Sequence, residues 1–358
     1  MRKPKAVDLF CGAGGLTTGL RQAGYSVVGA VELDALASAA YRANHRNVKL
    51  WQRDIRRVTG AEMMRGLGLQ RGQLDLLAAC PPCQGFSGLR TKNGIRQNRD
   101  PRNALVMDVL RLTRSMRPKS VMLENVPGLA RSKRYRTILK GLKALGYHVK
   151  WAVLNTVDFG VPQKRRRLVL LASTLGAPAF APTMDVRVTV RTVIGSLTRP
   201  SKSRDCLHNY PVKRSGKVAA LIKRIPRDGG SRKALGQDAQ LPCHKDLDGF
   251  RDVYGRMAWD KPSPTITGGC INPSKGRFLH PSANRAVTLR EAALLQTFPK
   301  SYRFPLAKGG RYAVALLIGN ALPPEFIRRH ALELQRVLTT ERKPSRTPQQ
   351  SSPTEQRT

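Results

Sequence analysis

The stretch AVDLFCGAGGLTTGLRQAG, residues 6–24, decides the fold. It begins with a short apolar run, Ala6–Phe10, which predicts a buried strand, and continues through a glycine turn into a helical segment that Gly24 closes. Strand, glycine turn and helix in this order form the first unit of a nucleotide-binding α/β fold. The spacing is neither Gly-x-Gly-x-x-Gly nor a P-loop, so the turn alone indicates a nucleoside-like ligand or a plain tight turn.

Two acidic residues follow the turn at the ends of the next two predicted strands. Glu32 ends Ser26–Val31, about 20 residues past the glycines, where such folds place a ligand for ribose hydroxyls. Asp54 follows the third strand, 48–51, and can accept a hydrogen bond from an adenine amino group. No lysine lies in the turn to meet a phosphate charge. This pattern favours S-adenosylmethionine over a nucleotide.

The most informative chemistry lies where the fourth and fifth predicted strands end. The run Leu74–Ala78 leads into CPPCQGFS, residues 80–87, whose two prolines force the chain out of the sheet. The fifth strand, Ser120–Leu123, delivers Glu124 at its end. Because the carboxyl ends of parallel strands share one edge of a sheet, we expect Cys83 and Glu124 to act together. A nucleophile and an acid so paired suit attack on a heteroaromatic ring.

Cys80-x-x-Cys83 is also the spacing of a redox or zinc pair. Against zinc, the sequence has no second Cys-x-x-Cys, and Cys243-His244 stands alone. A thioredoxin-like chain would not carry the other motifs. We therefore interpret Cys83 as the nucleophile and Cys80 as support beneath the following loop, and we expect no metal.

Charge is the outlying feature of the composition. The 358 residues include 64 Lys and Arg against 23 Asp and Glu, a net charge of +41, while a hydrophobic content of 41% supports a real core. This surplus favours a polyanionic partner, most simply nucleic acid, over a basic proteome or a solubility trait. Basic residues are frequent in Gln84–Arg102, which we interpret as a lid closing on a phosphate backbone rather than a solvated loop.

The second half of the chain is less regular. Prolines after Ser173 predict a hinge into a second domain, and residues 185–300 predict short strands, including a strand and turn at 264–269, in a region that selects the substrate. Thr288 with Glu291 predicts a capped structural helix. Six irregularly spaced cysteines predict a reducing compartment, and no apolar stretch suits a signal peptide or a membrane span.

Five motifs in order make the chain resemble the DNA (cytosine-5)-methyltransferases over roughly residues 6–338. They are DLFCGAGG at 8–15, PCQ at 82–84, ENV at 124–126, QKRRR at 163–167 and GN at 319–320. The resemblance implies an α/β fold: a Rossmann-like sheet of the S-adenosylmethionine-dependent methyltransferase type, with helices on both faces, and a smaller, irregular target-recognition domain. The corresponding ranges are 1–180 for the catalytic domain, 181–304 for target recognition, 305–338 for a return to the large domain and 339–358 for a disordered tail.

The resemblance also implies roles for individual residues. Cys83 would add to C6 of cytosine, Glu124 would hold or protonate N3, and Arg165 would contact the base and help to fix Glu124. The residues implied around S-adenosylmethionine are Phe10, Gly12, Gly14, Glu32, Asp54, Ile55, Pro82 and Asn320. The residues expected to contact DNA are Gln84, Ser87, Arg90, Arg99, Arg167, Arg256 and Thr265.

The expected activity is methyl transfer from S-adenosylmethionine to C5 of a flipped-out cytosine in a specific duplex DNA sequence. We expect a monomer that uses no metal, lies in the cytoplasm with the nucleoid, and contacts no membrane. A cognate restriction endonuclease would act separately. Two alternatives stay open: a transfer-RNA cytosine-5 methyltransferase of the same fold, and a catalytically silent DNA-binding regulator. The recognition sequence and the base that removes the C5 proton do not follow from the sequence.

Overall fold

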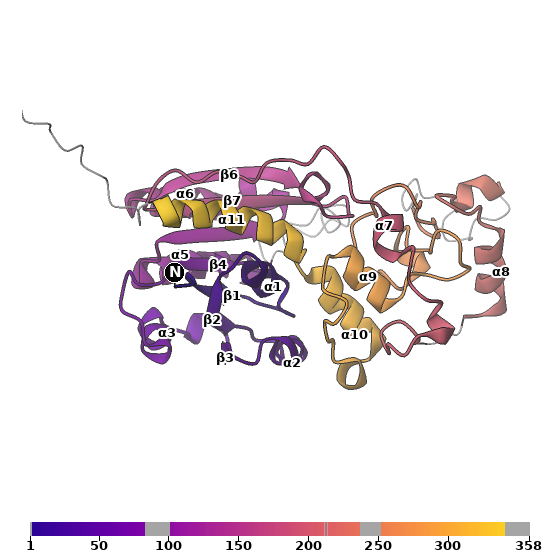
Figure 1. Ribbon diagram of the computed structural model, residues 1–358, viewed down its shortest axis with the longest axis horizontal. Helices are drawn as coiled ribbons and strands as arrows, with labels where there is room; N and C mark the ends of the chain where they lie inside the picture. The colour runs from indigo at the N-terminus through magenta and orange to yellow at the C-terminus, as the bar shows by residue number, and fades with distance from the viewer. Residues whose placement is uncertain (1, 83–100, 211, 213, 237–251, 341–358) are drawn as a thin grey trace, which may run out of the picture.

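The computed structural model describes residues 2–82, 101–210, 212, 214–236 and 252–340 (Figure 1). Its centre is a seven-stranded sheet in the order β3-β2-β1-β4-β5-β7-β6. Neighbouring strands among β1 to β5 pair in parallel, and β7 runs antiparallel between β5 and β6. This confirms the expected α/β class. The strands are β1 (Lys5–Leu9), β2 (Ser26–Val31), β3 (Lys49–Trp51), β4 (Leu76–Ala79), β5 (Ser120–Asn125), β6 (His148–Asn155) and β7 (Arg166–Ser173).

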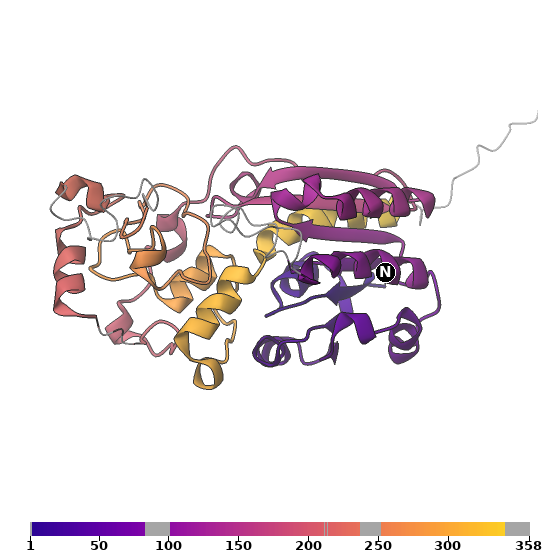
Figure 2. The same ribbon diagram turned by 180° about the vertical axis from the view of Figure 1, so that it is seen from behind.

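Helices cover both faces of the sheet, and each face has its own apolar core. On one face, residues of α1, α2 and α11 pack on the inward side chains of β1, β4 and β7. On the other, α3, α5 and α6 form the second core; Figure 2 shows α5 and α6 in front of the sheet, with α11 behind it. The bounds are α1 (Gly15–Gln22), α2 (Ala35–Asn44), α3 (Gly60–Leu67), α5 (Val106–Met116), α6 (Lys133–Ala144) and α11 (Pro324–Thr340).

A smaller lobe stands beside the carboxyl edge of the sheet (Figure 1). Its helices are α7 (Val190–Ile194), α8 (Gly216–Arg224), α9 (Leu289–Leu295) and α10 (Leu306–Asn320), and the rest is irregular chain with short 3-10 turns. The expected short strands are wrong for the described part of residues 185–300, where only isolated bridges occur, including one between Gln163 and Ser263. Residues 264–269 therefore form an irregular segment before a turn. The predicted capping box of Thr288 and Glu291 is confirmed at α9.

The sequence predicted a return to the large lobe over residues 305–338, which hold α10 and α11. Val314, Ala315 and Ile318 of α10 share one core with Ala292, Ala293 and Leu295 of α9. Helix α11 lies on the sheet, where Phe326 and Leu334 pack with Leu16 and Leu20 of α1. Helix α10 therefore packs with α9, in a core that also includes Ala13 and Ala40 of the large lobe.

None of the helices in the described ranges has the length and apolar character needed to cross a membrane.

Candidate active site

The ends of β4 and β5 lie side by side, as the sequence predicted. The two strands pair in parallel with Ala79 beside Leu123, so Cys80 and Glu124 are the next neighbours along the ladder. The Asn125 side chain donates to the carbonyl oxygen of Pro81 at 3.0 Å. A buried amide on β5 therefore holds the first of the two prolines that precede Cys83.

Glu124 is a buried carboxyl group with a hydrogen bond at one oxygen and an ion pair, without hydrogen-bond geometry, at the other. Its side chain is 2% exposed. The Cys80 Sγ donates to Oε2 at 3.1 Å, and the Arg167 Nε lies 2.9 Å from Oε1. Burial raises the pKa of Glu124, while the charges of Arg167 and Arg165 and the Cys80 hydrogen bond act in the opposite direction. The group therefore holds a proton more readily than an exposed glutamate while its position is held by neighbouring strands.

Arg165 and Gln163 tie the start of β7 to the smaller lobe. The Arg165 Nη1 donates to the carbonyl oxygens of Ile266 at 2.9 Å and Gly319 at 3.1 Å. The Gln163 side chain accepts from the Ile266 amide at 2.8 Å. Arg165 contributes charge near Glu124, and within the described ranges the ion pair with Glu124 is made by Arg167. Arg167, which we expected to contact DNA, is thus directed at the carboxyl group in this structure.

Several expected residues lie outside the described part of the chain. They are Cys83 itself and the loop residues Gln84, Ser87, Arg90 and Arg99. Pro82 is the last described residue before them and is partly exposed. Their roles stay predictions from the sequence.

The glycine turn leaves the sheet at its carboxyl edge, between β1 and α1. Phe10 adopts a left-handed backbone conformation with φ 61°, which is costly for a bulky residue and marks a constrained turn. The Gly12 amide donates to Glu32 Oε2 at 2.8 Å, and Glu32 Oε1 accepts from the amides of Leu33 and Asp34. Burial raises the pKa of Glu32. A side chain on Gly12 would meet nothing within 4 Å, so open space adjoins the turn.

A buried hydrogen-bond network that includes Tyr302 and His45 packs against the glycine turn. The Tyr302 hydroxyl donates to the carbonyl oxygen of Ala13, and His45 Nε2 lies 3.1 Å from the same hydroxyl. A side chain on Gly14 would stand 2.6 Å from both groups, so only glycine fits there. The Tyr302 carbonyl in turn accepts from Arg290 of α9 at 3.0 Å. The smaller lobe therefore helps to hold the glycine turn.

The remaining expected cofactor residues lie near the same edge. Asp54 caps a 3-10 turn, Ile55–Arg57, just after β3, and the Arg56 guanidinium lowers the pKa of its carboxyl group to about 2. Ile55 is buried in the core. Asn320 is exposed at the end of α10. The carbonyl oxygen of Leu322, two residues later, lies where a side chain on Gly15 would stand, so this segment passes close to the glycine turn.

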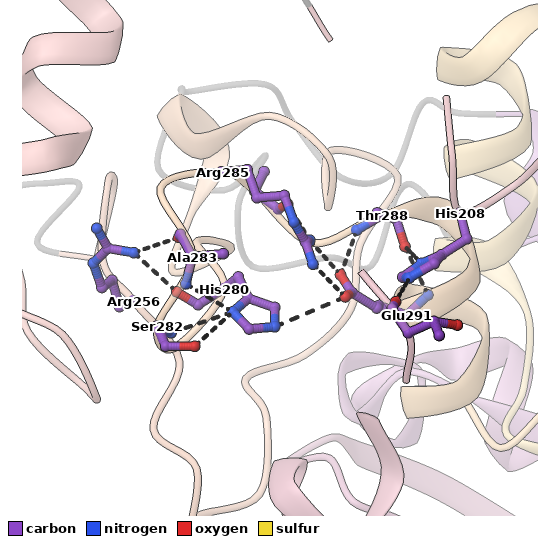
Figure 3. Close-up of polar contacts among 10 residues, drawn as sticks. His208, Arg256, His280, Ser282, Ala283, Arg285, Thr288 and Glu291 are labelled. Carbon is purple, nitrogen blue, oxygen red and sulfur yellow. Dashed lines mark hydrogen bonds and ion pairs between the residues drawn. The ribbon is translucent and has the colours of Figure 1, made fainter. Parts of the chain in front are cut away.

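Arg256 does not point outward. Its side chain is fully buried, and its guanidinium donates to the carbonyl oxygens of Ile222, Ile225, His280 and Ala283 and to the Asn284 side chain. Figure 3 shows this hub next to His280, whose ring faces the carboxylate of Glu291. Arg256 thus joins the end of α8 to the loop at 280–284, and we leave it out of the proposed DNA-contacting set. The Thr265 hydroxyl donates to the carbonyl oxygen of Lys164 at 2.7 Å.

Three site residues were missed from the sequence: Cys80 and Arg167 as partners of Glu124, and Tyr302 as a support of the turn. The positions of Cys80 and Arg167 could have been predicted from the pairing of their strands with β5. Alternate residues of a strand share a face, and Glu124 pairs with Val169, so Arg167 lies diagonally across the ladder on the same face. Tyr302 carries no such signal, because it reaches Ala13 across 289 residues of chain.

Comparison with known proteins gives one consistent result. The family model for C-5 cytosine-specific DNA methylases matches residues 4–336. Type II methylase M.HgiDII of Herpetosiphon aurantiacus is 36% identical, over 93% of this chain and 95% of that protein. Type II methyltransferase M.XorII of Xanthomonas oryzae pv. oryzae is 32% identical, over 94% of this chain and 86% of that protein.

Solved structures agree on the fold. A protein encoded within an Escherichia coli prophage, described as a candidate DNA modification methyltransferase, has a TM-score of 0.68 at 24% identity and covers 94% of this chain and 100% of its own. The sheet order, the buried carboxyl group at the end of β5 and a family match over nearly the whole chain lead to one conclusion. The chain belongs to the C-5 cytosine-specific DNA methylase family.

Proposed function

We propose that this enzyme transfers a methyl group from S-adenosylmethionine to C5 of a cytosine flipped out of a specific duplex DNA sequence, through a covalent bond between Cys83 and C6. The observation that carries the proposal is the buried Glu124 carboxyl group, held by Cys80 and Arg167 beside the strand that leads to Cys83. A buried carboxyl group with a raised pKa at a strand end suits an acid that serves a ring nitrogen.

The proposed chemistry follows from the weakness of cytosine C5 as a nucleophile. The Cys83 thiolate adds to C6, and the displaced ring electrons make C5 electron-rich while Glu124 donates a hydrogen bond or proton to N3. S-adenosylmethionine, when bound, would supply the electrophilic methyl group to C5 and leave as S-adenosylhomocysteine. Loss of the C5 proton and departure of Cys83 from C6 then restore the aromatic ring. Arg165 contacts the base and adds positive charge near Glu124.

The residues around the glycine turn fit S-adenosylmethionine. Open space adjoins Gly12, and Leu33, an apolar side chain with 65% exposure, lies next to Glu32. Glu32 accepts three backbone hydrogen bonds, and a carboxylate offers about four acceptor sites, so one remains for a ribose hydroxyl. The residues that would hold the ligand are Phe10, Gly12, Gly14, Glu32, Asp54, Ile55, Pro82 and Asn320.

Duplex DNA is the proposed substrate because the target atoms are inaccessible inside a stacked duplex and the chain carries a net charge of +41. The smaller lobe would read the sequence. Gln84, Ser87, Arg90, Arg99 and Thr265 remain the proposed DNA contacts. Because the relatives are named as Type II enzymes, we propose that this enzyme protects DNA in a restriction-modification system, as a cytoplasmic monomer with a separate endonuclease.

Bisulfite sequencing of DNA from cells that express the enzyme tests the substrate and reveals the recognised sequence. We expect methylated cytosine at one short sequence, absent from cells that express Cys83→Ala. Cys206→Ala is the matched control, because Cys206 is an exposed cysteine of the smaller lobe. Methylation that survives Cys83→Ala but is lost in Cys80→Ala would overturn the choice of nucleophile.

A parallel assay with purified transfer RNA and duplex DNA separates the two polynucleotide substrates. We expect methyl transfer to duplex DNA alone. Transfer to transfer RNA alone would replace the proposed substrate, and binding without any transfer would indicate a silent regulator.

A further inference from the structure

Cys80 occupies a special place in the sheet. It extends β4 by one residue, and its amide donates to the carbonyl oxygen of Leu9 at 3.3 Å. Because Ala78 pairs with Met122, and alternate residues share a face, Cys80 and Glu124 continue the same row of side chains. The pleat of β4 therefore directs the thiol to the carboxyl group. The observed distance, 3.1 Å from Sγ to Oε2, agrees with that placement.

Cys80 and Arg167, the partners of Glu124 in the part of the chain that the structure describes, differ in kind. Arg167 on β7 approaches Oε1 with a full positive charge at 2.9 Å. Cys80 on β4 approaches Oε2 with a neutral, weak donor. A second cation there would favour the carboxylate strongly and oppose proton transfer, whereas an apolar side chain would leave a buried oxygen with less compensation. A thiol lies between these extremes and can remain in contact with either protonation state.

We propose that Cys80 is a positioning residue for Glu124: its thiol holds Oε2 in the orientation that the cytosine ring requires and keeps the carboxyl group able to exchange a proton. This inference rests on the proposed role of Glu124. It assigns Cys80 a part in the methyl-transfer step distinct from that of the nucleophile.

The test compares Cys80→Ala with Cys80→Ser in the full-length enzyme, using the duplex sequence found by bisulfite sequencing. Loss of a hydrogen bond worth about 1 kcal/mol corresponds to a rate about five-fold lower, so we expect Cys80→Ala to slow single-turnover methyl transfer roughly 3- to 10-fold. The KM values for DNA and S-adenosylmethionine should not change. Cys80→Ser, which keeps a donor, should restore most of the rate.

The pH dependence supplies a readout that packing alone would not move. Cys80→Ala removes a donor to the ionised carboxylate, so the pKa of Glu124 should rise and the Glu124-dependent limb of the rate profile should shift to higher pH. Glu124→Gln identifies this limb, because the limb should be missing from its profile. Cys80→Ser should leave the limb at the wild-type position or lower.

Three outcomes decide between the claims. If Glu124→Gln reacts at the wild-type rate, the proposed role of Glu124 fails, and the inference about Cys80 fails with it. If Glu124→Gln is slow but neither Cys80 variant changes the rate or the pH profile, only the inference about Cys80 fails. Equal slowing in Cys80→Ala and Cys80→Ser, with an unmoved pH limb, would show that Cys80 acts through packing and would also overturn it.

Discussion

Replacing Asp8 with asparagine should make the protein more stable at pH 8 and leave its stability nearly unchanged at pH 4. Asp8 lies near the end of β1, fully buried between Ala30 of β2 and Ala78 of β4. Its Oδ2 accepts from the Thr17 hydroxyl at 2.7 Å, and its Oδ1 has no hydrogen-bond partner within the described ranges. An ionised carboxylate is poorly compensated in such a place.

Burial raises the pKa of Asp8 from 3.8 to about 7, against the Thr17 hydrogen bonds and with a small addition from the charge of Glu32. The unfolded chain releases this proton near pH 3.8, whereas the folded protein keeps it until about pH 7. The contribution of Asp8 to the free energy of unfolding is therefore complete below pH 3.8 and is lost as the pH rises to about 7. The difference corresponds to about 4 kcal/mol above that window.

The assay is urea unfolding of the wild type and Asp8→Asn at intervals from pH 4 to pH 8, with the difference between the two proteins plotted against pH. The amide preserves the acceptor for Thr17 and never ionises. The free energy of unfolding of the variant should therefore increase relative to that of the wild type as the pH rises. Asp75→Asn is the matched control, because Asp75 is equally buried but contacts Lys119 at 3.0 Å and the Lys5 amide at 2.8 Å. It should be less stable than the wild type at pH 8.

An Asp8→Asn protein that is less stable than the wild type by the same amount at pH 4 and pH 8 would refute the reasoning. It would mean that the stabilising form of Asp8 is not the neutral one.

Tyr302→Phe removes the hydroxyl that donates to Ala13, so the Kd for S-adenosylmethionine should rise several-fold while the Kd for DNA stays unchanged; equilibrium binding of each ligand checks both. Glu124→Gln should slow methyl transfer roughly 10²- to 10⁴-fold in single-turnover assays, because a general acid is lost. Arg167→Lys keeps the charge but loses the planar fork, so it should slow transfer less than Arg167→Ala; equal rates for the two would mean that charge is not what Arg167 supplies. Arg256→Met should lower the free energy of unfolding by about 3–5 kcal/mol, since buried carbonyl groups lose their donors; unchanged stability with altered sequence preference would restore Arg256 as a DNA reader.

The sequence identified the parts of this protein that depend on near neighbours in the chain. The apolar run at 6–10, the glycine turn and the helix after it follow from local periodicity and turn chemistry, and the observed β1 and α1 agree with them. The capping box of α9 follows from the spacing of Thr288 and Glu291. The exit of Glu124 beside the end of β4 follows from the rule that parallel strands share one edge.

Only the tertiary structure decided which groups meet across the sheet and between the lobes. The ion pair of Arg167 with Glu124 depends on the register of β7 against β5. That Arg256 is buried depends on carbonyl groups from the end of α8 and from the loop at 280–283 converging on it, where a basic composition suggested a surface residue. Tyr302 reaches Ala13 because the smaller lobe docks beside the turn. Local sequence determines what each segment forms, whereas partners distant in the chain are chosen by the packing of whole elements.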